Sequence, residues 1–278
     1  AASGRGQDRG PVIAEFDAGS EINATFTGTT TLEGGDAGGS IDISADAALV
    51  ITDMVQSTDA QNISAGSVAF VVGATTGSLR LNGAADVSVT ATAGDVTMDD
   101  GATLISTSGN IGLDASGSVV LSDVQGGAVT VQAASGSIGT ASGQLDAVVM
   151  ATSVTLDAGT TIGVTGTPLL LEVTTVTSIT AGGDAVIRTT RESAVGAIMM
   201  ANGDLALSST HGLTLTADSA VASALVEADA GDIVMGAGVT LDAASGAITF
   251  VATGDITLGD VVGGVVDLTA GGEIQGYP

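Results

Sequence analysis

Two stretches of this chain carry the same pattern: GDVTM at residues 94–98 and GDIVM at residues 231–235. Residues 94–133 align with residues 231–270 at a constant offset of 137 without a gap, and 18 of the 40 aligned pairs are identical. A short motif of Gly, a polar residue and a branched apolar residue returns within each copy, from Gly94 to Gly117 and from Gly231 to Gly254. Constant spacing between short apolar segments is typical of stacked coils, because each coil must match the length of the coil below it.

Short runs of alternating apolar and polar residues fill most of the chain from Gly39 onward. Val87-Ser88-Val89 and Leu213-Thr214-Leu215 are examples, and turns of Gly, Asp or Ser separate such runs. Period-two alternation with β-branched residues indicates short strands that bury one face, and few windows fit a helix. We therefore predict an all-β fold, a parallel β-helix with about three short strands in each coil of roughly 20 to 27 residues.

A β-sandwich is the alternative, because strand starts that recur about every eight or nine residues also suit hairpins. The hairpin dipeptides Asn-Gly and Asp-Gly occur only three times, beginning at Asn82, Asp100 and Asn202. That number is too small for about two dozen strands joined by tight hairpins, so the parallel β-helix is favoured. In the β-helix, the positions expected to point inward and stack are Val96, Ile111, Val129, Ile233, Ile248 and Ile256.

Composition favours one elongated solenoid that follows a short N-terminal region. The chain contains 42 Gly, no Trp, 4 Phe and 1 Tyr, whereas a compact globule usually fills its centre with aromatic rings. Residues 1–38 differ from the rest, because Pro11 interrupts them and only two short apolar runs occur there. We predict an N-terminal extension or arm over residues 1–38 with one or two strands, and a β-helix over residues 39–278 that contains the duplication.

The charge balance disfavours two classes of partner. The chain has 31 acidic and five basic residues, a formal net charge of −26, and both nucleic acid and anionic lipid require basic surfaces. No apolar stretch is long enough to span a bilayer as a helix, so no membrane insertion is expected. Cysteine is absent, so neither disulfides nor thiolate metal sites contribute.

Three short units carry a family resemblance: GDVTM at residues 94–98, GNIGL at residues 109–113 and GDITL at residues 254–258. They resemble the repeats of large bacterial exoproteins of the filamentous-haemagglutinin type and of autotransporter passenger domains, over about residues 39–276. The resemblance implies a right-handed parallel β-helix, export from the cell, and a role in adhesion or in extracellular fibres. An extracellular or cell-surface location is the corresponding expectation.

Among side chains with catalytic or metal-binding chemistry, carboxylates are abundant and histidine is rare. His211 is the only histidine and lies in a predicted turn, where it is expected to be exposed. No catalytic residue is predicted. Turn carboxylates suit calcium, which prefers oxygen ligands; the alternative interpretation is that they cap turn backbone. The candidate calcium ligands are Asp99, Asp100, Glu227, Asp229 and Asp232, and no other cofactor is expected.

The repeat pattern continues to the C-terminus without a recognisable capping segment at either end. An open β-helix end exposes backbone edges and an apolar stacking surface. Either the chain is a piece of a longer solenoid, or neighbouring copies cover its ends head to tail. The residues expected to form such an assembly contact are Val12, Ile13, Phe16, Ile22, Phe26, Ile274 and Tyr277.

We therefore predict a secreted structural protein, a subunit or segment of a surface filament, sheath or adhesin stalk that assembles end to end with other copies of itself. The alternative is an adhesin module whose lateral face binds glycans or a host surface. The least favoured hypothesis is a polysaccharide-degrading enzyme on a β-helix scaffold.

Overall fold

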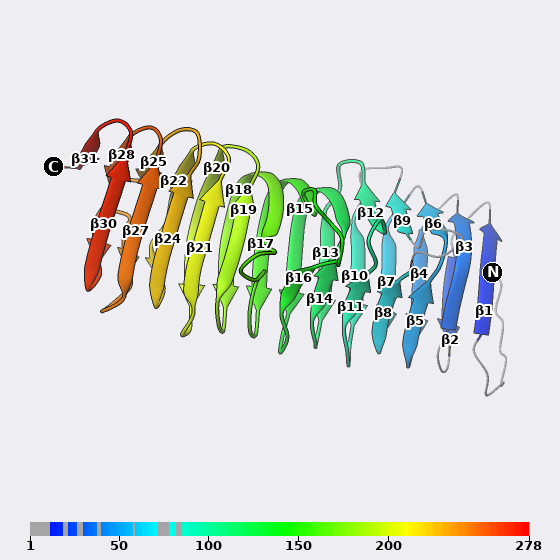
Figure 1. Ribbon diagram of the computed structural model, residues 1–278. Coiled ribbons are helices and arrows are strands. Elements are labelled where there is room, and N and C mark those ends of the chain that lie inside the picture. The colour runs from blue at the N-terminus through cyan, green and yellow to red at the C-terminus, as the bar shows by residue number, and fades with distance from the viewer. Residues whose placement is uncertain are drawn as a thin grey trace. The chain divides into compact units, whose positions relative to one another are not determined.

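The computed structural model describes residues 12–18, 22–26, 30–37, 40–57, 59–71, 78–81 and 85–277. Within these ranges the chain forms 31 β-strands and no helix, so no described helix is available to cross a membrane. The chain divides into two compact units, Ala1–Met150 and Ala151–Pro278. Each unit is a stack of parallel coils (Figure 1).

The strands of the first unit are β1 (Val12–Ala18), β2 (Ile22–Phe26), β3 (Thr30–Ala37), β4 (Ile41–Ala45), β5 (Ala48–Ile51), β6 (Met54–Ser57), β7 (Gln61–Ala65), β8 (Ser67–Phe70), β9 (Ser78–Leu81), β10 (Val87–Ala91), β11 (Val96–Met98), β12 (Thr103–Ser106), β13 (Ile111–Ala115), β14 (Val119–Leu121), β15 (Asp123–Ala133) and β16 (Ile138–Thr140). Strand β17 (Val149–Ala158) begins at the end of this unit and continues into the next.

The strands of the second unit are β18 (Leu169–Ala181), β19 (Ala185–Thr189), β20 (Ser193–Met200), β21 (Asp204–Ser209), β22 (Leu213–Leu215), β23 (Ser219–Ala220), β24 (Ser223–Ala228), β25 (Ile233–Met235), β26 (Thr240–Asp242), β27 (Ala247–Ala252), β28 (Ile256–Leu258), β29 (Asp260–Val262), β30 (Val265–Ala270) and β31 (Ile274–Gly276).

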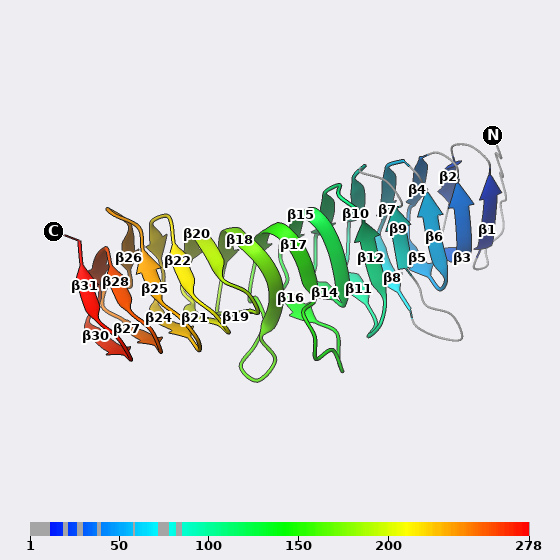
Figure 2. The same cartoon turned by 90° about the horizontal axis from the view of Figure 1, so that it is seen from above.

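In both units, each coil contributes one strand segment to each of three parallel ladders, which we call A, B and C in chain order. In the first unit, β7, β10 and β13 belong to ladder A, β8, β11 and β14 to ladder B, and β9 and β12 to ladder C. In the second unit, ladder A contains β21, β24, β27 and β30, which lie side by side in Figure 1. Ladder B contains β22, β25, β28 and β31 (Figure 2), and ladder C contains β23, β26 and β29.

This topology confirms the predicted parallel β-solenoid with three strand segments per coil, and the β-sandwich alternative is wrong. A sandwich of hairpins requires antiparallel neighbours, whereas every described ladder between the named strands is parallel. The connections between strands are corners of the coil rather than hairpin turns. This explains why Asn-Gly and Asp-Gly dipeptides are so rare.

The duplication in the sequence corresponds to repeated positions in the ladders. Ile111 pairs with Val129 in the first copy, and Ile248 pairs with Val266 at the equivalent place in the second. The duplication likewise relates β11 with β14 to β25 with β28, and β12 with β15 to β26 with β29. The two copies therefore define equivalent coils, one inside the first unit and one at the end of the second.

The core is a set of stacked columns of apolar side chains. All six positions predicted to point inward have a relative exposure of at most 1%. One column of ladder A consists of small residues: Ala65, Ala91, Ala115 and Ala133 follow one another in successive coils and are buried. The backbone turns a corner directly after this position, which leaves little space inside the coil. We infer that only a small side chain fits here when the adjacent coils turn the same corner.

Some coils are shorter than the sequence predicted. The coil that leads from Ile111 to its register partner Val129 is shorter than the expected minimum length of roughly 20 residues. It is short because β15 passes from ladder C to ladder A as one continuous strand. Gly127 allows this bend, since a Cβ atom there would lie 2.7 Å from the carbonyl oxygen of Ser108 in the coil below. The expected loop residues are therefore missing at this corner.

The N-terminal region contains three strands that join the same ladders as later coils. β1 pairs in parallel with β3, and β2 pairs in parallel with β4. β3 in turn pairs with β5 through its first half and with β6 through its second half. The strands on both sides of the expected boundary at residue 39 thus belong to one set of ladders.

Candidate functional site

Aspartates that precede strands connect successive coils through hydrogen bonds. The Asp95 Oδ1 atom accepts a hydrogen bond of 2.6 Å from the backbone N–H of Ser118 in the next coil. At the equivalent place in the second copy, Asp232 Oδ1 accepts one of 2.8 Å from the N–H of Asp255, and Asp255 Oδ1 accepts one of 2.7 Å from that of Glu273. A carboxylate acceptor strengthens such bonds. These acidic side chains therefore hold adjacent coils in register.

The calcium candidates are not brought together. Asp99 and Asp100 lie in the turn after β11 in the first unit, whereas the other three candidates lie in the second unit. Glu227 is part of β24, Asp229 forms an ion pair with Arg188, and Asp232 accepts the inter-coil hydrogen bond. Among the residues that the structure describes, no group of three or more His, Cys, Asp or Glu side chains could hold a metal ion.

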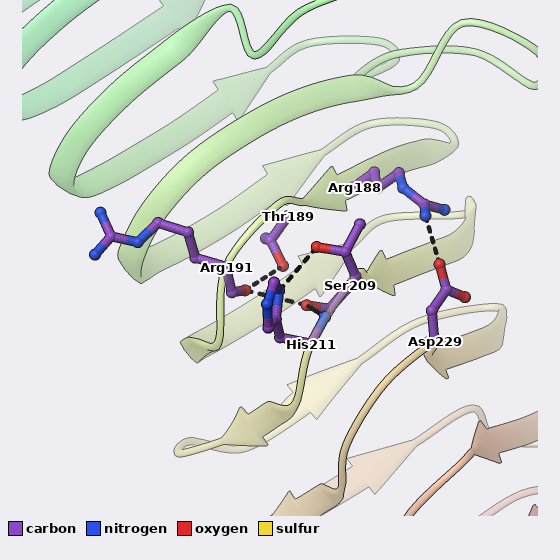
Figure 3. Close-up of polar contacts among 7 residues, drawn as sticks. Arg188, Thr189, Arg191, Ser209, His211 and Asp229 are labelled. Carbon is purple, nitrogen blue, oxygen red and sulfur yellow. Dashed lines mark hydrogen bonds and ion pairs between the residues drawn. The ribbon is translucent and has the colours of Figure 1, made fainter.

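A polar corner of the second unit surrounds the only histidine (Figure 3). The carbonyl oxygen of Arg191 accepts hydrogen bonds from the buried hydroxyls of Thr189 and Ser209 at 3.2 and 3.1 Å. The buried hydroxyl of Ser193 lies 3.1 Å from the same oxygen and donates its closer hydrogen bond, of 2.8 Å, to the Val173 carbonyl. The backbone N–H of His211 donates to the Ser209 Oγ atom at 3.1 Å. Thr189 and Ser209 replace the alanines that other coils carry at this corner, and the hydrogen bonds of these hydroxyls fix the turn.

His211 is exposed, as predicted, and the polar corner does not arrange it as a base. Its ring Nδ1 atom lies 2.9 Å from the Thr210 Oγ1 atom, the only partner of the ring among the described residues. Ser209 is fully buried and its hydroxyl donates to the Arg191 carbonyl. A nucleophile with a base held by a third group is therefore not assembled here.

Asp123, at the start of β15, is a partly buried acidic residue. Burial raises the pKa of Asp123 above its ordinary value of 3.8, and hydrogen bonds from Gln125 Nε2 to both carboxylate oxygens, at 3.1 and 3.2 Å, oppose this rise. A group with a raised pKa in the folded state binds its proton preferentially there. Ionised Asp123 therefore destabilises the fold above its folded-state pKa, and this effect disappears as the pH falls towards 3.8.

We expect Asp123→Asn to be more stable than the unmodified protein at pH 7, with a difference that shrinks as the pH approaches 3.8. Asparagine keeps an acceptor for Gln125 and removes the partly buried charge. The measurement is urea unfolding at pH 7 and pH 4. Asp114→Asn, at an exposed position of β13, is the control for losing one negative charge from an acidic protein. Equal stabilisation by both substitutions would contradict the role given to burial.

The last coil carries an exposed apolar surface. We define the terminal surface as the inward-register residues of β29, β30 and β31, namely Val261, Val266, Leu268, Ala270 and Ile274. Val266 is 40% exposed and Ile274 is 50% exposed. In the first copy, Val129 occupies the place of Val266 and is 1% exposed.

The backbone edge of the last coil is also open. In the described pairings, β29, β30 and β31 each pair only with a strand of the preceding coil. Tyr277, which follows β31, is 46% exposed. Uncovered apolar side chains beside unpaired strand edges favour the addition of another strand layer. The terminal surface is therefore the candidate functional site.

Of the residues predicted for assembly, Ile274 and Tyr277 lie at this end. Val12, Ile13 and Phe16 lie on β1, and Ile22 and Phe26 lie on β2.

The inter-coil role of the aspartates was not predicted from the sequence. A usable signal was present, because an aspartate recurs directly before a strand at equivalent places of both copies, at Asp95 and at Asp232, and again one coil later at Asp255.

No protein-family model matches this chain, and comparisons with curated proteins and with solved structures find no match either.

Proposed function

We propose that this chain is an extracellular structural protein, a subunit or segment of a surface filament, sheath or adhesin stalk, whose solenoids join end to end. The observation that carries the proposal is the terminal surface. Val266 and Ile274 are exposed at the last coil, whereas Val129, the counterpart of Val266 in the first copy, is buried. A further coil stacked on the terminal surface would bury Val266 in the way that Val129 is buried in the first copy.

Chemistry and fold support a structural role in other ways. A parallel solenoid extends by adding coils, so its natural product is a long object rather than a closed globule. The net charge of −26 opposes contact between lateral faces, which leaves the apolar end as the favoured contact. The resemblance to filamentous-haemagglutinin-type exoproteins and autotransporter passengers supports the extracellular location and the role in fibres or adhesion.

A second candidate function is the binding of a neutral glycan on a lateral face. A groove of about 380 Å³ lies on the outer side of ladder A in the second unit. Asp184, Asp204 and Ser223 line it together with the apolar Val186 and Leu225. Hydroxyl and carboxylate groups beside small apolar areas suit a sugar, whose hydroxyls alternate with C–H faces.

The test of the structural role is electron microscopy of the purified protein at rising concentration. We expect filaments that lengthen with concentration, and bundles when salt screens the negative charge. Val266→Asp is expected to abolish lengthening, because the charge would be buried at the contact. Val265→Asp adds the same charge at the adjacent outward position of β30 and should still form filaments. Protein that remains as single particles at high concentration would contradict the proposal.

A further inference from the structure

The last coil presents three open strand edges in a defined order. Its strands are β29 in ladder C, β30 in ladder A and β31 in ladder B. The duplication shows that these ladders are equivalent to those of the first unit, because β15 corresponds to β29 and β30, and β14 to β28. A coil that continues the solenoid must therefore supply C, A and B segments in that chain order.

The first strands of this chain have the required order. Residues 16–18 of β1 pair with residues 35–37 of β3, which pair with β6, and β6 pairs with β9 of ladder C. β2 follows in ladder A, because its partner β4 pairs with β7. The first half of β3 follows in ladder B, because its partner β5 pairs with β8. In the described pairings, β1 and β2 each have a single partner strand.

We propose that a second copy of this chain stacks its first strands on the last coil in parallel register, so that ladders A, B and C continue through the junction. Residues 16–18 lie along β29 of the neighbouring copy, β2 lies along β30, and the first half of β3 lies along β31. This proposal rests on the proposed end-to-end assembly and specifies its occupant and register. Strand edges of one copy thus find partners on the other.

The junction requires an exchange of strands in ladder B. Residues 12–14 pair with the same half of β3 that the register assigns to β31 of the neighbouring copy. The pairing of β1 with β3 shifts in register between Ala14 and Phe16, so residues 12–14 form a separate segment of the pairing. In the assembled state, β31 takes the place of residues 12–14, while residues 16–18 keep their own partner.

The residue types at the junction agree with this register. Three residues of the terminal surface meet a residue of the neighbouring copy in the same column: Leu268 meets Ala24, Ala270 meets Phe26 and Ile274 meets Thr30. The backbone register also places Val261 beside Phe16 and Val266 beside Ile22. Within its own chain, Phe26 is the register partner of Ala45. A large side chain between two alanines suits the narrow corner of ladder A.

The test uses cysteine pairs, because the chain has no cysteine of its own. The register places Thr269 of one copy beside Thr25 of the next, and both positions are exposed. Parallel neighbours lie about 4.8 Å apart, within the Cα separation of about 4.4–6.8 Å that a disulfide spans. Thr25→Cys and Thr269→Cys are made as separate proteins and mixed, so that any mixed disulfide joins two molecules.

We expect the mixture, in a glutathione redox buffer, to give at least about tenfold more covalent dimer than either protein alone, since docking raises the local thiol concentration. Mass spectrometry of the linked peptides identifies the bond. A positive control is the double variant Val251→Cys with Thr269→Cys, which are register partners in adjacent coils of one chain. A negative control is Gln275→Cys mixed with Thr25→Cys, because Gln275 lies in ladder B.

The strand exchange has its own cysteine pair. The register places Gln275 of one copy beside Thr31 of the next, at the position that Ile13 holds in the unassembled chain. Gln275→Cys mixed with Thr31→Cys should therefore give covalent dimer in a yield similar to that of the first mixture. A covalent dimer through positions 25 and 269, without one through positions 31 and 275, would overturn the strand exchange. Residues 12–14 would then stay paired with β3, and β31 would be the strand displaced from ladder B.

The outcomes also separate the register from the assembly itself. Filaments without the 25–269 disulfide, while the positive control forms its bond, overturn the register and leave the proposed function standing. Equal dimer yields when Gln275→Cys and Thr269→Cys are each mixed with Thr25→Cys also overturn the register. The absence of both filaments and dimers overturns the register together with end-to-end assembly, and further coils of a longer chain then remain as the occupant.

Discussion

Val129→Asp lowers the free energy of unfolding by roughly 3–5 kcal/mol, whereas Val266→Asp changes it by less than about 1 kcal/mol. The two residues occupy the same place in the two copies of the duplicated segment. Val129 is 1% exposed and Val266 is 40% exposed. A carboxylate at Val129 is buried without a partner, while a carboxylate at Val266 reaches solvent.

The measurement is urea unfolding followed by far-ultraviolet circular dichroism, at a protein concentration too low for association. Ile111→Asp and Ile248→Asp serve as controls, because both residues are at most 1% exposed and both substitutions should destabilise by several kcal/mol. An equal loss of stability in Val129→Asp and Val266→Asp would show that the last coil is covered in the isolated chain. The terminal surface would then not exist.

Gly246→Ala is expected to lower stability by roughly 2–4 kcal/mol, an unusual loss for one methyl group. A Cβ atom on Gly246 would lie 1.8 Å from the carbonyl oxygen of Ala222 in the coil below. That oxygen belongs to the backbone, so the clash is relieved only when the two coils move apart. Because stacked coils depend on their nearest neighbours, the displacement weakens the whole interface.

Gly112→Ala is the matched control for this substitution. Gly112 lies on the outward face of β13, and the nearest atom to a Cβ there is the Val87 carbonyl oxygen at 4.0 Å. Removing glycine from a strand that accommodates a methyl group should stabilise the chain by a few tenths to about 1 kcal/mol, through the unfolded state. The midpoint temperature of thermal unfolding should therefore fall for Gly246→Ala and rise for Gly112→Ala, relative to the unmodified protein. A similar shift in both would mean that the coils do not approach as closely at Gly246.

The fold was predictable because the constraint on a coil is repeated along the chain. The duplication predicted that residues such as Ile111 and Ile248 stack inward, and both are buried. The minimum coil length was not predictable in the same way. It depends on whether β15 rounds a corner without a loop, which follows from the close approach of Gly127 to Ser108 rather than from the local pattern.

The terminal site was predictable in outline, since the repeat register continues to Ile274. The inter-coil aspartates were not, because an aspartate before a strand looks the same whether it caps its own turn or accepts an N–H from the next coil. The raised pKa of Asp123 was also beyond the sequence pattern. Alternation alone does not reveal that this carboxyl group is partly buried.

The parallel direction of the ladders determines the symmetry of any assembly built through the terminal surface. A two-fold axis would set each terminal strand antiparallel to its own copy, whereas the described ladders between the named strands are parallel. Parallel stacking gives a heterologous contact, which does not close on itself unless the chain curves into a ring. The resulting polymer is polar, with two chemically different tips, so a single protein that recognises one tip would suffice to anchor it or to set its length.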